Sequence, residues 1–159
     1  MKRYSIIILK IVVILVGIPF LILGVLGLLT YVKEGPFNKE FAYFLYPIFI
    51  GIYLSLIPYY YSLYKAYKLL CYIGKNKAFS EDSVKTLKHI KYGAVSIIVM
   101  FIVIMPFVYL LADKDDAPGI IIIGMVPIFA ALVVAVFAIV LKKLLEDAIE
   151  IKSENDLTV

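Results

Sequence analysis

The sequence is poor in the residues with which proteins build reactive centres, because its 159 residues include one cysteine, one histidine and no tryptophan. A lone cysteine excludes a disulfide within the chain. One histidine and one cysteine also cannot by themselves supply the roughly three or four ligands of a zinc site. No phosphate-binding loop, dinucleotide fingerprint or zinc-protease motif is found. We therefore expect a protein that is not an enzyme and that needs no cofactor or metal.

Charged residues are scarce as well, at 18% of the chain, whereas hydrophobic residues make up 64%. Soluble domains have about 25% charged and roughly 45–50% apolar residues, so the excess indicates that the bilayer is the solvent. The sequence contains four charge-free runs, each long enough to cross a bilayer as a helix. They are residues 11–31, 41–63, 92–111 and 120–141. The runs do not alternate in polarity, which excludes a β-barrel.

We expect a single integral membrane domain over residues 1–159, folded as an all-α, four-helix transmembrane bundle. Its sixteen Lys and Arg residues are distributed unevenly, with three before the first run, seven between the second and third, and three after the fourth. The remaining three, Lys33, Lys39 and Lys114, lie in the two other connections, which are on the opposite side of the membrane. The positive-inside rule therefore predicts that both termini and residues 64–91 are cytoplasmic.

The second and third spans are expected to continue beyond the membrane as helices. No helix breaker follows Leu63 until Gly74, a residue type that is common just after a helix. Ser80 is a good N-cap, and Glu81 places negative charge in the first turn, where the helix dipole favours it. At 1.5 Å per residue, these helices exceed a core of about 30 Å by some 15 Å. We predict a cytoplasmic helical hairpin over residues 64–91.

The chain ends in an acidic segment whose charge is opposite to that of the hairpin. Residues 142–159, the predicted cytoplasmic tail, carry five acidic residues and three lysines, whereas the hairpin carries seven lysines and two acidic residues. Weak helix formers near the end predict that the helix stops near Ser153. An extended end with Leu157 and Val159 is then expected to dock near Phe79 of the hairpin, or on a partner protein. The alternatives are a frayed terminus and charges that are simply solvated near lipid headgroups.

Small residues recur along the first and fourth spans, which lets transmembrane helices approach closely. We interpret them as packing positions within the chain and leave a homo-oligomer seam as the alternative. They are Gly17, Gly24, Gly124, Ala131, Ala135 and Ala138.

Two stretches carry a family resemblance: residues 74–90, GKNKAFSEDSVKTLKHI, and residues 154–159, ENDLTV. Together with the four-span layout of the whole chain, they resemble the YoaS-like family, a domain-of-unknown-function family of small bacterial membrane proteins. The resemblance implies a multi-pass protein of the bacterial cytoplasmic membrane. It also implies, frequently, a neighbouring gene for a small helix-turn-helix regulator of the Cro/C1 type. It implies no established reaction.

The leading hypothesis is a non-enzymatic protein of the lipid bilayer that sequesters a cytoplasmic helix-turn-helix transcription regulator and releases it on a membrane signal. No direct contact with nucleic acid is expected. The regulator is basic where it meets phosphate, and the acidic segment from Glu146 to Asp156 is expected to cover that surface. The residues proposed to bind the partner are Asn76, Phe79, Ser80, Glu81, Leu87, Glu154, Asn155, Asp156 and Leu157.

Two alternatives from other classes stay open. One is an immunity or self-protection protein that shields the membrane from a peptide toxin through its outer loops. The other is a small-ligand carrier, which the lack of ionisable residues at mid-depth disfavours.

Overall fold

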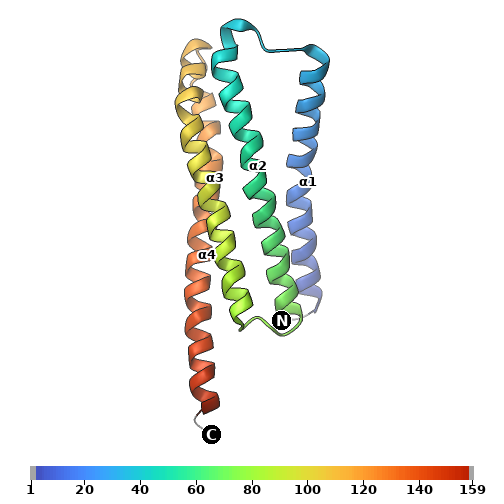
Figure 1. Ribbon diagram of the computed structural model, residues 1–159, viewed down its shortest axis with the longest axis vertical. Helices are drawn as coiled ribbons and strands as arrows, with labels where there is room; N and C mark the ends of the chain where they lie inside the picture. Colours follow the sequence, from blue (N-terminus) through green and yellow to red (C-terminus); the bar gives the residue numbers. More distant parts are fainter. Residues whose placement is uncertain (1–2, 158–159) are drawn as a thin grey trace.

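The computed structural model describes residues 3–157 and folds them into four helices. They are α1 (Arg3–Glu34), α2 (Lys39–Gly74), α3 (Glu81–Lys114) and α4 (Gly119–Leu157). Each helix is long and apolar enough to cross a membrane, and residues 3–157 contain no strand. The prediction of an all-α chain with four spanning helices is thereby confirmed. The beginning of α1, the end of α4 and the α2–α3 turn lie at one end of the molecule, which we call the lysine-rich end (Figure 1).

The helices end where the backbone turns into the left-handed region. Gly35 after α1 has a φ of 86°, Asn76 after α2 a φ of 60°, and Asp116 after α3 a φ of 50°. Glycine adopts this conformation freely, and Asn and Asp tolerate it better than most residues do. Ser80 caps α3 as predicted, because its Oγ accepts a hydrogen bond from the backbone N–H of Ser83 at 3.4 Å.

The fourth helix is longer than the sequence predicts. It continues to Leu157, so the expected end near Ser153 is wrong. The propensity penalty of Asn or Asp is only about 0.7 kcal/mol, and adding a residue to an existing helix costs far less than nucleating one. Leu157 is 84% exposed on the last turn, and the predicted docking of this side chain near Phe79 is not found. Val159 lies outside the described residues.

In Figure 1, α2 lies between α1 and α3, and α4 overlaps α3. Close backbone contacts join α1 to α2, α2 to α3 and α3 to α4, and within residues 3–157 the backbones of no other pair of helices approach as closely. The contact between α1 and α2 is the sparsest of the three. The backbones of the four helices therefore form an open row, whereas the hydrophobic clusters of buried residues combine side chains of α2, α3 and α4.

Two glycines bring α2 and α3 together. A Cβ atom added at Gly51 of α2 would overlap the side chain of Ile104 on α3, and one at Gly93 of α3 would overlap the hydroxyl of Ser62 on α2. The Cβ at Gly93 would also lie 3.2 Å from the carbonyl oxygen of Pro58. Each helix thus offers a notch to a side chain of the other, which sets the register of the pair.

Tyrosine hydroxyls of α2 hold α1 in place. A helical carbonyl keeps a second lone pair beside its intrahelical bond, so it can accept one more hydrogen bond. Three such bonds run from α2 to α1, from Tyr53 to Gly24 at 2.9 Å, from Tyr59 to Val16 at 2.8 Å and from Tyr60 to Gly17 at 2.8 Å. Polar contacts of this kind associate helices in lipid, where apolar surface alone gives no preference between helix and lipid.

The six small residues that the sequence indicates as packing positions all lie at contacts within the chain. Those of α1 face α2, and those of α4 face α3. A Cβ added at Gly17 would lie 3.3 Å from Leu63, one at Gly24 3.6 Å from Leu56, and one at Gly124 3.0 Å from the sulfur of Met105. The buried residues of α4 are Ala131, Ala135 and Ala138.

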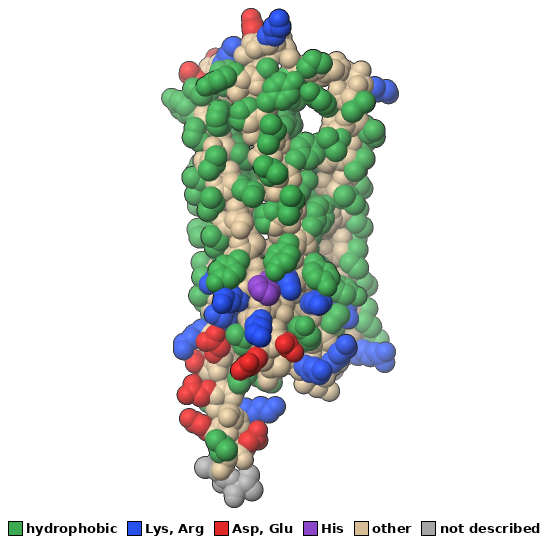
Figure 2. All heavy atoms as spheres, in the orientation of Figure 1, with side chains coloured by type: hydrophobic (Ala, Val, Ile, Leu, Met, Phe, Trp, Pro, Cys, Tyr) green, Lys and Arg blue, Asp and Glu red, His purple; other side chains and the backbone are tan. Residues whose placement is uncertain are grey.

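The outer surface of the row is apolar over the middle of all four helices. Figure 2 shows a broad hydrophobic band with charged side chains gathered at its two ends. Large side chains point out of this band, among them Ile123 at 71% and Phe137 at 63% exposure. A patch of this size would be a liability in water, and it is the surface that lipid tails cover in a membrane.

We expect the lysine-rich end to be cytoplasmic, which labelling of single cysteines in intact cells measures. In a Cys71→Ser background, Lys114→Cys should react with a membrane-impermeant maleimide, because Lys114 lies at the opposite end of α3. Lys75→Cys should react only after the cells are permeabilised. Reaction of Lys75→Cys in intact cells would show that the lysine-rich end lies outside the cell and would contradict the predicted topology.

Gly93→Val should lower the stability of the protein in detergent by about 1–3 kcal/mol, because the new methyl groups meet Ser62 and the Pro58 carbonyl. Helix propensity alone would change stability in the opposite direction. The matched control is Gly119→Val, since no atom lies within 4 Å of a Cβ at Gly119. Thermal unfolding of Gly93→Val at the wild-type temperature would refute the close approach.

Candidate functional site

The turn between α2 and α3, residues 75–80, is held by two serines. Ser80 Oγ donates a hydrogen bond to the carbonyl oxygen of Lys77 at 2.6 Å, and Ser83 Oγ donates to the same oxygen at 3.1 Å. Ser83 is fully buried, although the sequence analysis did not select it. The backbone N–H of Lys77 donates to the carbonyl oxygen of Tyr72 at 2.8 Å, which ties the turn to α2. These hydrogen bonds fix the backbone conformation of the turn.

Apart from Leu87, the residues proposed to bind a partner lie in three places. Asn76, Phe79 and Ser80 belong to the turn, where the Phe79 side chain is 58% exposed. Glu81 and Glu154 lie together in a groove between α3 and α4. The last three, Asn155, Asp156 and Leu157, are on the final turn of α4.

Leu87 has a different position from the other proposed partner residues. It is 5% exposed and packs with Ile90 of α3 and Ala138 of α4. Its side chain belongs to the contact between these two helices. We therefore remove Leu87 from the surface proposed to meet a partner.

The groove that contains Glu81 and Glu154 is shallow, with a volume of about 540 Å³. It runs between the first turns of α3 and the last part of α4. Its lining residues are Glu81, Val84, Lys85, Glu146, Ile149, Glu150, Ser153 and Glu154. Four carboxylates and one lysine make the groove negative, so it suits a basic partner surface. We call it the acidic groove.

Two ion pairs, each between residues four apart, support α4, and one of them includes Glu146 of the acidic groove. Lys142 lies 3.4 Å from Glu146, and Lys143 lies 3.2 Å from Asp147. Hydrogen bonding to Asp147 raises the pKa of Lys143 above its ordinary value, so this pair stays charged. Such pairs stabilise a helix by only a few tenths of a kcal/mol, roughly 0.2–0.5 each. The two ion pairs help to keep this part of α4, which carries the acidic residues, helical.

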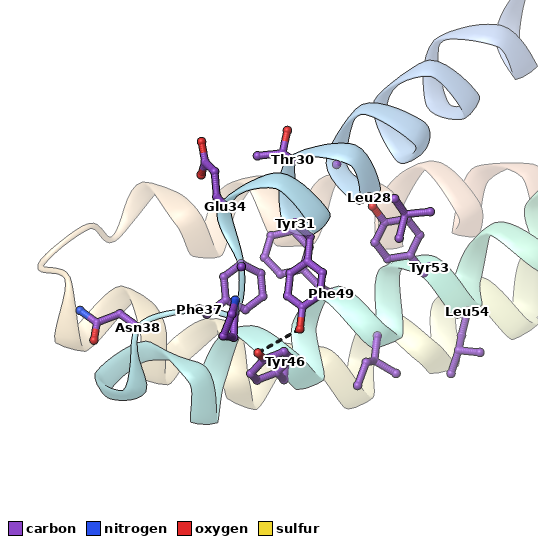
Figure 3. A pocket seen from close by; sticks show the side chains of 14 residues that line it. Leu28, Thr30, Tyr31, Glu34, Phe37, Asn38, Tyr46, Phe49, Tyr53 and Leu54 are labelled. Atoms are coloured by element: carbon purple, nitrogen blue, oxygen red, sulfur yellow. Dashed lines mark hydrogen bonds between the residues drawn. The ribbon is translucent and has the colours of Figure 1, made fainter.

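An aromatic cavity lies at the opposite end, between the last turns of α1 and the first half of α2 (Figure 3). The hydroxyls of Tyr31 and Tyr46 are 3.2 Å apart and share a hydrogen bond. The rings of Phe37 and Phe49 are stacked, with centres 5.1 Å apart and an angle of 20°. Tyr53 closes the cavity toward the middle of the helices.

The aromatic cavity has a volume of about 870 Å³, which is within the usual range for small-ligand sites. Its polar side chains Glu34 and Thr30 point away from the ring cluster (Figure 3). The cavity therefore suits an apolar chain or ring and offers no group for acid–base chemistry. The sequence analysis did not find it, because the spacing of these rings also fits an ordinary interfacial belt.

No group of three or more His, Cys, Asp or Glu side chains within residues 3–157 is placed to hold a metal ion. The described geometry thus offers surfaces and an apolar cavity, and the acidic groove is the strongest candidate for binding a partner.

Comparison with known proteins identifies the family to which the chain belongs. The model of the family described as "Protein of unknown function (DUF2975)" matches residues 29–159. The chain is also 53% identical, over 163 aligned positions, to the "Uncharacterized membrane protein YoaS" of Bacillus subtilis (strain 168), and the alignment covers 100% of both chains. No solved structure matches. The resemblance to the YoaS-like family is confirmed, and the chain belongs to the DUF2975 family and is a membrane protein.

Proposed function

We propose that this protein binds a helix-turn-helix transcription regulator at the bacterial cytoplasmic membrane and releases it on a membrane signal. The role is one of binding, without catalysis. The acidic groove carries the proposal, because it concentrates four carboxylates at the end of the molecule that the lysine bias assigns to the cytoplasm.

Charge complementarity supports this partner. A regulator that binds DNA is basic where it meets phosphate, so an acidic surface can cover the same face and compete with DNA. The last turns of α4 extend beyond the α2–α3 turn (Figure 1). Phe79 and Leu157, both exposed, give apolar anchor points next to the charges.

The membrane signal is proposed to act through α1 and α2. α1 contacts no other helix than α2 within the described residues, and the aromatic cavity separates the two helices near their connection. A molecule that enters this cavity would change the tilt of α1 at low cost. α2 continues from the cavity to the turn at the lysine-rich end, so it links the two regions.

The full-length protein in detergent should capture the helix-turn-helix regulator that the family resemblance predicts to be encoded nearby. Glu150→Gln with Glu154→Gln should weaken capture about fivefold, since two exposed charge pairs are worth roughly 1 kcal/mol. Asp113→Asn with Asp115→Asn is the matched control, because it removes the same charge at the opposite end. Co-purification and its salt dependence measure the effect.

Two results would count against the proposal. One is that the wild-type protein fails to retain its native regulator at low salt. The other is that the groove variant and the control variant capture it equally well.

A further inference from the structure

A basic and aromatic patch crosses α2 and α3 where the apolar band meets the lysine-rich end. It consists of Tyr61, Lys65 and Lys68 on α2 and of Lys88, His89 and Tyr92 on α3, and we call it the Lys–Tyr patch. Tyr61, Lys65 and Lys68 follow one another at spacings of four and three residues, which place them on one face of α2. On α3, Tyr92 lies four residues after Lys88 and three after His89, so it neighbours both side chains. Figure 2 shows the single histidine of the chain at the lower edge of the apolar band, with basic side chains on both sides.

The patch is joined across the two helices by aromatic contacts. The rings of Tyr61 and His89 have centres 6.1 Å apart. Lys65 Nζ lies 5.5 Å from the centre of the Tyr61 ring, and Lys88 Nζ lies 5.7 Å from that of Tyr92. Cation–π contacts of this kind hold the ammonium groups at the level of the rings, at the edge of the apolar band. The amines are thus placed where headgroup phosphates of a bilayer lie.

The positive charge of the patch is not neutralised within the described residues. The ion pairs formed there by lysines belong to Lys142 and Lys143 of α4. Hydrogen bonding to the side chain of Tyr64 raises the pKa of Lys68 above its ordinary value, so Lys68 remains a cation. Lysines without a carboxylate partner are available to an anion from outside the chain.

His89 adds a second observation that indicates a missing partner. Its Nδ1 atom is buried and has no hydrogen-bond partner among the described residues. A buried polar atom without a partner costs free energy, and proteins rarely leave one in that state. A hydrogen bond from this atom to an oxygen of a bound group requires rotation of the imidazole toward the surface of the patch.

We propose that the Lys–Tyr patch binds the headgroup of one anionic phospholipid of the inner leaflet. The phosphate lies between Lys65 and Lys88, and the acyl chains follow the apolar faces of α2 and α3. Basic pockets between transmembrane helices on the cytoplasmic side recognise anionic lipids in this way. The lipid site shares only the membrane orientation with the proposed function and needs no regulator.

Native mass spectrometry of the delipidated full-length protein in neutral detergent tests the site. Phosphatidylglycerol should form a one-to-one complex more tightly than phosphatidylcholine. Lys65→Gln with Lys88→Gln should weaken this complex about 30-fold, since each lysine near an anionic surface is worth about 1 kcal/mol. Lys142→Gln with Lys143→Gln removes the same charge outside the patch and should leave the affinity unchanged.

A second variant keeps the test valid if Lys65→Gln with Lys88→Gln misfolds. His89→Gln keeps the net charge and should weaken phosphatidylglycerol binding by about threefold while circular dichroism stays that of wild type. Three results would overturn the site: equal binding of the two lipids, equal weakening in the patch and control variants, or displacement of the lipid by an equal concentration of inorganic phosphate. The last result would assign the patch to free phosphate. None of these outcomes depends on capture of the regulator.

Discussion

The contact between α2 and α3 is the interaction on which the rest of the structure depends. Within the described residues, close backbone contacts join α1 only to α2 and α4 only to α3. In lipid, apolar surface alone does not decide which helices associate, so close packing has to do so. Gly51 and Gly93 make this packing close, because each accepts a side chain of the opposite helix.

The two outer helices are attached by different means, and this difference fits the proposed function. α4 packs its buried alanines along α3, which gives the acidic groove a firm position at the lysine-rich end. α1 is attached more sparsely, and its contact with α2 includes tyrosine hydroxyls that donate to backbone carbonyls. A helix held by a few polar contacts can shift without disturbing the core. The aromatic cavity lies where this attachment is interrupted.

The spans and the cap of α3 could be predicted from the sequence, because charge-free runs and the Ser80 cap are local signals. The end of α4 could not, since small differences in propensity are overruled by the cooperative extension of an existing helix. The burial of Leu87 was not predicted, because the residue belongs to the stretch that carries the family resemblance, and a resemblance does not say which side chains of that stretch face another helix. The notches at Gly51 and Gly93 were missed because isolated glycines in an apolar run do not identify their opposite side chains.

The open row of helices could not be predicted from the sequence either, because spans that are apolar on all sides do not specify which helices they contact. Short bifunctional crosslinking of cysteine pairs in native membranes, in the Cys71→Ser background, tests this arrangement most directly. Pairs across the adjacent helices, Gly17→Cys with Leu63→Cys and Gly124→Cys with Met105→Cys, should crosslink within one chain. A pair on the exposed faces of α1 and α4, Ile14→Cys with Phe137→Cys, should not. Efficient crosslinking of this last pair within one chain would show a closed bundle and contradict the account.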